Sequence, residues 1–285
     1  MNMRALARTL GGEPRGRNRV LCPGPGHSKA DRSLSVIFNG GAGPVVHSFA
    51  GDDWRLCKNH VSALLGGAAY VWSTPQQCER ERDDERTAIA RTLWSEGIDP
   101  RGTPAEDYLG SRGLTLTNAA RKALRFHPHP KYPAGWGPTL LAAFRLLETD
   151  EITAVHRIRV DQPARWPKTF RKMLGPVRGA AVKLAPVVDM LAVAEGVETA
   201  IAANQMGYCP AWALGSAWAV EHLPVLPAVK HLILLAENND ASRKATEACG
   251  NRWADAGRRV TRIWPREDCD DLNDELMLEV SDGAA

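Results

Sequence analysis

Short apolar runs alternate with stretches of helical periodicity toward the carboxyl end of the chain. Such runs, when they are bounded by turns and followed by helices, are typical of buried strands in a parallel sheet. The pattern therefore predicts a Rossmann-like parallel α/β domain over residues 187–280. The expected strands lie at 187–194, 210–214, 231–236 and 259–264, with helices at 198–206, 217–222 and 241–256.

Upstream of residue 187 the pattern is more mixed and divides into three parts. Residues 1–70 combine an amphipathic start with two short alternating runs and a helical stretch, and they predict a small module. Residues 71–86 carry mixed charge with few apolar positions and predict a linker that leads into a solvated helix. Residues 87–186 predict a mixed α/β region with helices near 87–97 and from Thr103-Pro104, and paired strands at 139–147 and 152–160.

Acidic side chains follow three of the predicted parallel strands. Glu195 ends the first, Glu237 and Asp240 follow the third together with Asn239, and Asp271 follows the fourth. The carboxyl ends of parallel strands meet at one edge of a sheet, where α/β proteins bind ligands. Carboxylate oxygens at such an edge suit Mg²⁺ or Mn²⁺ held against phosphates.

This acidic segment resembles the Toprim domain of DNA primases, topoisomerases and some nucleases. The similarity lies in the Glu195-Gly196 turn after the first strand and in the run Asp271-Leu-Asn-Asp274. Where the family carries Asp-x-Asp, this chain has Glu237-Asn-Asn239, followed by Asp240. The resemblance implies phosphoryl transfer, with Glu195 as the catalytic base or a metal-linked carboxylate. It implies Mg²⁺ ligands at Glu237, Asn239, Asp240 and Asp271.

A knuckle near the amino end resembles the zinc ribbon at the front of bacterial and phage primases. The run Cys22-Pro-Gly-Pro-Gly-His27 brings a thiol and an imidazole together, and Ser33-Leu-Ser-Val36 follows it. Ser48 and Asp52 stand about where the family has later cysteines. A structural zinc ion needs four ligands. The resemblance implies Zn²⁺ held by Cys22, His27, His47 and Cys57, with Asp52 or His60 as a substitute.

Positive charge is concentrated in two segments although the net charge is only +3. Residues 157–183 hold eight Lys and Arg against one acid, Asp161, and residues 4–32 hold seven against two acids. A segment with many more basic than acidic residues beside an acidic metal site is typical of an enzyme that acts on nucleic acid. The alternative is that these side chains only form a solvated surface. The candidate nucleic-acid contacts are Arg157, Arg159, Lys168, Arg171, Lys172 and Arg178.

Several classes of protein are disfavoured by what the sequence lacks. It has no Gly-x4-Gly-Lys-Ser/Thr loop for ATP, and none of its four tyrosines lies in a recognisable second catalytic domain. No apolar run approaches the roughly 18 residues of a membrane span, so no membrane contact is expected. The six cysteines are scattered, which favours a reducing cytoplasm.

The order of a zinc-ribbon-like module, a primase-core-like region and a Toprim-like domain predicts a DNA primase. Such an enzyme joins nucleoside triphosphates into short primers on single-stranded DNA, and a separate helicase would be its partner. A compact protein of this kind suits a plasmid, a phage or another mobile element. The Asn at 239 and the altered zinc knuckle keep two alternatives open: a DNA-binding protein with a weakened Toprim domain, and a metal-dependent nuclease.

Overall fold

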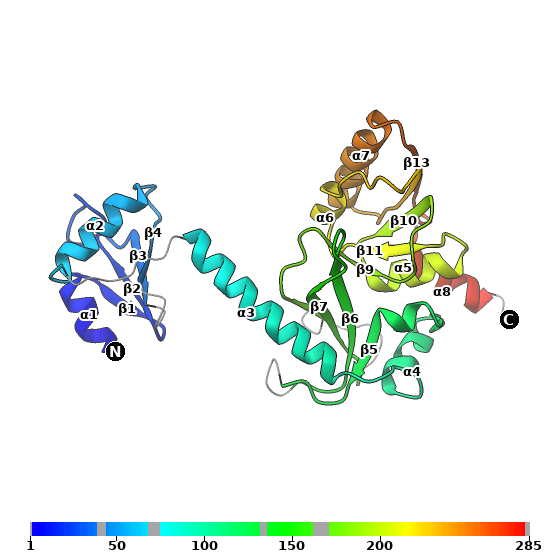
Figure 1. Ribbon diagram of the computed structural model, residues 1–285, viewed down its shortest axis with the longest axis horizontal. Helices are drawn as coiled ribbons and strands as arrows, with labels where there is room; N and C mark the ends of the chain where they lie inside the picture. Colours follow the sequence, from blue (N-terminus) through cyan, green and yellow to red (C-terminus); the bar gives the residue numbers. More distant parts are fainter. Residues whose placement is uncertain (1, 39–43, 68–74, 132–135, 162–170, 283–285) are drawn as a thin grey trace. The chain divides into compact units, whose positions relative to one another are not determined.

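The structure is a computed structural model of the chain. It describes residues 2–38, 44–67, 75–131, 136–161 and 171–282. The chain divides into two compact units, Met1–Asp84 and Glu85–Ala285. Each unit is described by itself below (Figure 1).

The first unit is a small antiparallel sheet with two helices. Within its described residues the sheet has four strands in the order β1 (Glu13–Arg15), β2 (Arg19–Cys22), β3 (Leu34–Phe38) and β4 (Pro44–Ser48). The helices α1 (Met3–Thr9) and α2 (Trp54–Leu64) contribute Ala7, Cys57 and Val61 to the core that these strands form. The predicted amphipathic start and helical stretch are helices α1 and α2, and the two alternating runs are β3 and β4, whereas β1 and β2 were not predicted as strands.

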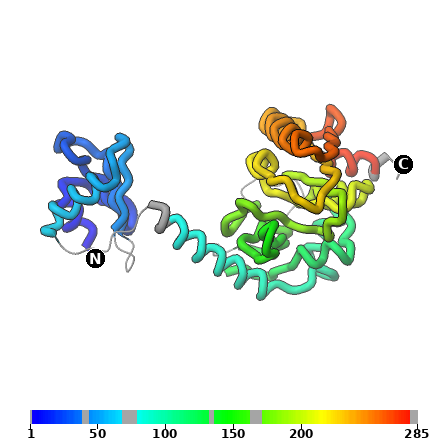
Figure 2. Tube along the Cα trace, turned by 45° about the horizontal axis from the view of Figure 1, so that its top comes forward, coloured from blue at the N-terminus to red at the C-terminus, as the bar shows by residue number. Residues whose placement is uncertain are grey.

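Helix α3 (Pro75–Glu96) crosses the boundary between the units and is drawn in cyan in Figure 2. The residues predicted as a linker, 71–86, therefore include the first half of a helix, while 71–74 lie outside the described residues. The final turns of α3 belong to the second unit, because Ala90, Leu93 and Trp94 are buried there against strand residues such as Leu141 and Val155. The mixed-charge part of the helix is mostly exposed, as its composition predicts.

One sheet runs through the second unit and includes strands from both regions that the sequence pattern separates, residues 87–186 and residues 187–280. Its nine strands in the described ranges follow the order β13-β12-β10-β11-β9-β6-β7-β8, with β5 also paired to β6. The strands β10 (Met190–Ala194), β11 (Ala211–Ala213), β12 (His231–Leu235) and β13 (Arg259–Ile263) are parallel. The others pair in antiparallel fashion: β5 (Leu124–His127), β6 (Thr139–Leu146), β7 (Ile152–Arg159), β8 (Arg171–Leu174) and β9 (Ala180–Lys183).

Helices cover both faces of the parallel strands, as the apolar runs predict. Leu191 and Val193 of β10 face the cluster formed by α6 (Ala217–Glu221) and α7 (Asp240–Asp255). Ala192 and Ala194 face the opposite cluster, which includes α5 (Val197–Gln205) and α8 (Leu272–Asp282). The α/β fold of this domain is confirmed.

Two helices outside the parallel strands test the local signals in the sequence. Helix α4 (Pro104–Ser111) begins as predicted, with the Thr103 hydroxyl accepting a hydrogen bond from the backbone N–H of Ala105. Helix α8 was not predicted, since the last expected element was the strand at 259–264. Leu272 and Leu276 are buried in the core, and this packing against α5 stabilises a helix that sequence periodicity alone did not show.

The parallel strands present their carboxyl ends, and the turns that follow them, at one edge of the sheet. The turn after β11 lies against the turn after β10, since the N–H of Gly215 donates to the carbonyl of Glu195 at 2.8 Å. The N–H of Asn238, after β12, donates to the carbonyl of Asp270 at 2.9 Å. This edge is therefore a single continuous site. Among the described helices, none has the length and apolarity that a membrane span requires.

Candidate active site

A cleft of about 710 Å³ opens at this edge of the sheet. One side comes from the turns after the parallel strands and the other from the region before residue 187. The acidic side is lined by Glu195, Gly196, Gly215, Glu237, Asn238, Asn239, Asp270, Asp271 and Asp274. The other lining residues are Arg112, His156, Arg171 and Met173. The structure thus brings Glu195, Glu237, Asn239 and Asp271 together, as the sequence predicted.

Glu195 lies at the floor of the cleft with an unsatisfied oxygen. Its Oε1 is buried and accepts no hydrogen bond from any described residue. A buried carboxylate oxygen without a partner is unfavourable, because the charge loses water and gains nothing in return. A cation bound beside it removes this penalty.

Asp271 is a second carboxylate of the cleft that is half-buried. Its Oδ1 accepts the backbone N–H groups of Asn273 and Asp274 at 2.8 and 3.1 Å, and its Oδ2 accepts the Thr199 hydroxyl at 3.0 Å. Burial raises the pKa of Asp271 in spite of these bonds. The geometry fixes the carboxylate, and loss of contact with water disfavours its charged form.

The turn after β12 departs from the prediction at two residues. Asn239 caps helix α7, with its Oδ1 accepting the N–H of Ser242 at 2.9 Å and its Nδ2 donating to Glu237 Oε2 at 3.1 Å. The amide oxygen predicted as a metal ligand is therefore already engaged. Asp240 begins α7, is exposed and does not line the cleft, because the helix directs it away from the strand end. A metal ligand at Asp240 is not supported by its position.

Mg²⁺ fits the chemistry of this cleft through Glu195, Glu237 and Asp271. These are hard oxygen donors, which the ion prefers, and one of them carries the unpartnered buried oxygen. When bound, the ion would polarise phosphate oxygens. Across the described ranges, no three His, Cys, Asp or Glu side chains come close enough to hold one ion by themselves. The ligand set stays a prediction.

Arg171 is fixed at the wall of the cleft by a buried carboxylate. Its Nη2 lies 2.7 Å from Glu198 Oε1 and 3.1 Å from the Tyr108 hydroxyl, which in turn donates to the same Glu198 oxygen at 2.5 Å. Glu198 is 6% exposed. Burial lowers the pKa of Arg171, but Glu198, Tyr108 and Asp271 together outweigh this effect and the pKa is raised overall. The Nε and Nη1 groups of Arg171 have no partner among the described residues and remain for an anion in the cleft.

His156 lines the cleft as a neutral imidazole. Burial, together with the positive charges of Arg171 and Arg157, lowers its pKa to about 4 from an ordinary 6.5. Its Nδ1 is buried and has no hydrogen-bond partner in the described part of the chain. The imidazole therefore carries no charge at neutral pH and leaves the positive charge of this wall to the arginines.

Protonation of His156 should destabilise the second unit in acid. Because the pKa of His156 is lower in the folded than in the unfolded state, the free energy of unfolding keeps its full value above pH 6.5. It decreases as the pH falls from there toward 4. We expect His156→Gln to reduce the loss of unfolding free energy between pH 7 and pH 4 by about 3 kcal/mol. Urea unfolding at several pH values measures this. The raised pKa of Asp271 has the opposite effect on stability, equally in wild type and in His156→Gln. If the free energy of unfolding fell with pH equally steeply in both proteins, the depressed pKa of His156 would be contradicted.

The remaining predicted nucleic-acid contacts differ in their exposure. Arg157 is only 3% exposed, because β7 is an interior strand and the guanidinium lies against the ring of Trp136, 5.2 Å from its centroid. Arg157 was predicted to contact nucleic acid, but this burial leaves almost none of the residue exposed. Arg159 forms an ion pair with Asp161 at 2.7 Å. Lys172 and Arg178 are exposed, as predicted, and Lys168 lies outside the described residues.

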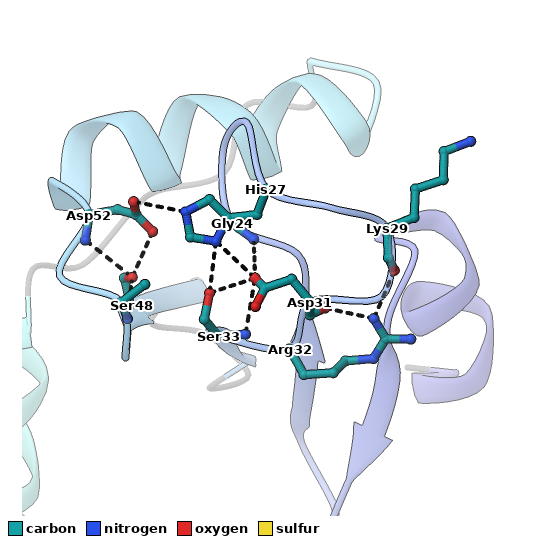
Figure 3. Close-up of polar contacts among 9 residues, drawn as sticks. Gly24, His27, Lys29, Asp31, Arg32, Ser33, Ser48 and Asp52 are labelled. Carbon is teal, nitrogen blue, oxygen red and sulfur yellow. Dashed lines mark hydrogen bonds and ion pairs between the residues drawn. The ribbon is translucent and has the colours of Figure 1, made fainter.

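The predicted zinc ligands are not gathered around one point. Figure 3 shows His27 between two carboxylates, with Nδ1 3.0 Å from Asp31 and Nε2 3.3 Å from Asp52. The Ser33 hydroxyl donates to Asp31 at 2.6 Å, and the Ser48 hydroxyl donates to Asp52 at 2.7 Å. The hydrogen bond that His27 donates to the Asp31 carboxylate raises the pKa of His27 above its ordinary value. Both ring nitrogens of the imidazole are therefore engaged by protein groups.

The other zinc candidates come from β2, β4 and α2 of the first unit. Cys22 and Cys57 are buried in its core, and burial raises the pKa of the Cys22 thiol to about 11. His47 is exposed and packs edge-on against Phe49. As placed, the predicted ligands do not form a four-ligand site in the described part of the unit, and no role for zinc is derived from it. Zinc binding stays a prediction from the sequence.

Sequence reasoning missed the residues that approach the cleft from outside the parallel sheet. Tyr108 and Arg112 come from α4 and the residue after it, and His156 comes from β7. Nothing in the local sequence marks them, because tertiary packing alone brings them to the cleft. The position of Glu198 weakly indicates a functional role, because it lies three residues after Glu195 in the first turn of α5. The favourable interaction of a carboxylate with the helix dipole accounts for that position equally well.

Two family models match this chain, and together they cover the second unit. Residues 190–282 match the family described as Toprim domain. Residues 84–184 match a family described as a domain of unknown function, DUF7146. No curated protein matches the chain by sequence.

Several solved primase structures are similar in fold. The primase fragment of the bacteriophage T7 primase-helicase matches with a TM-score of 0.45 and 16% identity, over 92% of this chain and 95% of that one. The Aquifex aeolicus primase, with its zinc-binding and RNA polymerase domains, matches with a TM-score of 0.48 and 15% identity, over 100% and 84%. A DNA primase domain from Pseudomonas aeruginosa matches with 0.43 and 18%, over 70% and 76%. At such values the likeness concerns the fold alone.

Proposed function

Residues 190–282 form a Toprim domain, and from this premise we propose that the chain is a DNA primase-like nucleotidyltransferase. It joins nucleoside triphosphates into short primers on single-stranded DNA by Mg²⁺-dependent phosphoryl transfer. The observation that carries the proposal is the cleft, where the carboxylates of Glu195, Glu237 and Asp271 face the guanidinium groups of Arg112 and Arg171. Carboxylates suit the metal, and arginines suit phosphates.

The residues of the cleft have different roles in phosphoryl transfer. Glu195, with its free buried oxygen, accepts the proton of the attacking hydroxyl or holds the metal that polarises it. Arg171 is anchored on one edge by Glu198 and offers its other edge to a triphosphate. Arg112 is held less tightly, 3.5 Å from Asp274, and adds a second positive charge on the same wall. Asp271 completes the negative side.

Partners follow from this reaction. Nucleoside triphosphates and single-stranded DNA are the substrates, and Lys172 and Arg178 are exposed for the template. A separate replicative helicase is the protein partner we expect, in the setting of a plasmid, a phage or another mobile element.

A DNA-binding protein without catalysis is the second candidate. The observation that favours it is the engagement of Asn239, whose side-chain oxygen caps α7 and so is not presented to a metal. One negative charge fewer at this position weakens the binding of a second cation.

A primer-synthesis assay separates the candidates. The purified chain is incubated with single-stranded DNA of varied sequence, labelled nucleoside triphosphates, and Mg²⁺ or Mn²⁺. We expect short labelled products that need both template and metal. Retained DNA binding without any product would favour the binding protein, and metal-dependent cleavage of labelled DNA would favour the nuclease.

A further inference from the structure

Three flat side chains form an exposed row on the second unit, outside the cleft. The rings of Trp218 and His222, one turn apart on and just after α6, stack with centroids 4.1 Å apart and planes 16° apart. The guanidinium of Arg178 lies over the Trp218 ring, 5.5 Å from its centroid. Trp218 is 46% exposed, which is unusual for so large an apolar group. We call these three side chains the aromatic row.

The aromatic row lies close to the proposed catalytic cleft. The turn between β11 and α6 begins with Gly215, which lines the cleft and hydrogen-bonds the backbone of Glu195. Trp218 follows three residues later, so its Cα is at most about 11 Å from that of Gly215.

Two glycines hold the elements that carry the row in fixed positions. Gly215 has a φ of +92°, and a Cβ there would lie 2.9 Å from the Phe144 ring. Gly175, at the start of the loop that carries Arg178, has a φ of +97°, and its Cβ would lie 2.2 Å from the carbonyl of Thr153. Both turns therefore pack closely on the sheet. A preorganised row loses little conformational entropy when a ligand binds to it.

The charge around the row suits a nucleic acid. A hollow of about 280 Å³ beside Trp218 is lined by Arg178, His222 and apolar or glycine residues, with no carboxylate among them. This contrasts with the acidic cleft next to it. Exposed aromatic rings beside an arginine are a combination by which proteins hold unpaired bases and their phosphates without reading sequence.

We propose that the aromatic row is a stacking platform for a base of single-stranded nucleic acid that runs to the cleft. Trp218 and His222 supply the stacked surface, and Arg178 binds the adjoining phosphate. The proposal rests on the proposed function for the course of the strand, but binding at the row needs neither metal nor catalysis.

Binding of a labelled single-stranded oligonucleotide to the full chain, measured by fluorescence anisotropy without metal or nucleotide, tests the platform. We expect Trp218→Ala to weaken binding about tenfold, because stacking on one aromatic ring contributes about 1–3 kcal/mol per base. Trp218→Phe keeps a stacking face and should retain most of the affinity. Val188→Ala truncates an exposed apolar residue that precedes β10, at the opposite edge of the sheet, and should bind as wild type.

Two further measurements separate stacking from charge and from folding. On an abasic strand of equal length the tenfold difference between wild type and Trp218→Ala should vanish, since only the bases are missing. Arg178→Ala should lower the slope of log affinity against log salt by about one, whereas Trp218→Ala should leave that slope unchanged. Thermal unfolding of each variant checks that the unit still folds.

The outcomes also separate this proposal from the proposed function. Equal binding by wild type, Trp218→Ala and Trp218→Phe overturns the platform even if primers are made. An equal loss in both Trp218 variants, or the same loss on the abasic strand, overturns it as well. A loss specific to Trp218→Ala on strands with bases supports the platform, and it does so even if the chain makes no primer.

Discussion

Replacing Glu195 by glutamine should lower primer synthesis about a thousandfold while single-stranded DNA binding is retained. Glutamine keeps the size of the side chain and removes its charge, so the buried Oε1 position no longer accepts a proton and binds a cation more weakly. General base catalysis alone contributes about 10²–10⁴-fold, and loss of a metal ligand acts in the same direction. Single-turnover extension of a short primer on a defined template, at saturating Mg²⁺, measures the effect.

A matched control comes from the exposed side of the same domain. Glu247 lies on α7 away from the cleft and is exposed, so Glu247→Gln removes the same charge and should leave primer synthesis at the wild-type level. If Glu195→Gln retained full activity, Glu195 would be neither base nor metal ligand. If both variants lost activity equally, the loss would reflect net charge and not the geometry of the cleft.

Replacing Glu198 by glutamine should both destabilise the second unit and weaken nucleotide binding. Glutamine still accepts the Tyr108 hydroxyl but leaves the Arg171 guanidinium without its counter-charge. Removing one partner of a fully buried ion pair costs about 3–5 kcal/mol. The Arg171 side chain is 32% exposed, so water replaces part of the lost interaction and we expect about 2 kcal/mol. Urea unfolding of the full chain measures this loss.

Kinetics distinguish a positioning role for Glu198 from a purely structural one. If Glu198 orients Arg171 toward the triphosphate, the KM for nucleotide should rise about tenfold in Glu198→Gln, and kcat should change less. Arg171→Ala should give a similar KM, and the double variant should show little further loss because both changes remove one interaction. An unchanged KM in Glu198→Gln, or fully additive effects, would leave Glu198 as a structural residue only.

The sequence by itself determined the parallel half of the fold and the acidic side of the cleft. The apolar runs before Glu195 and Glu237 are long enough to be strands buried on both faces, and the helices between them follow from periodicity. Once the strands are parallel, their carboxyl ends must meet at one edge. The meeting of Glu195, Glu237 and Asp271 in one cleft therefore needed no knowledge of the tertiary structure.

Only the tertiary structure decided which polar side chains have oxygen or nitrogen atoms left for a ligand. Asn239 and Asp240 both follow a strand end, yet one is used by the cap of α7 and the other is turned away by the same helix. Their roles depend on where the helix begins to within one residue, and sequence patterns do not fix helix ends so closely.

The basic residues of the cleft could likewise not be predicted from the sequence. Tyr108, 90 residues before Glu198, meets it only because α4 and α5 pack on the same sheet and bury both side chains. A run of basic residues marked Arg157 and Arg171 alike, but strand order buried the first against Trp136 and placed the second beside Glu198. Local sequence records composition and periodicity, whereas contacts between distant residues arise only when the sheet closes and its faces are covered.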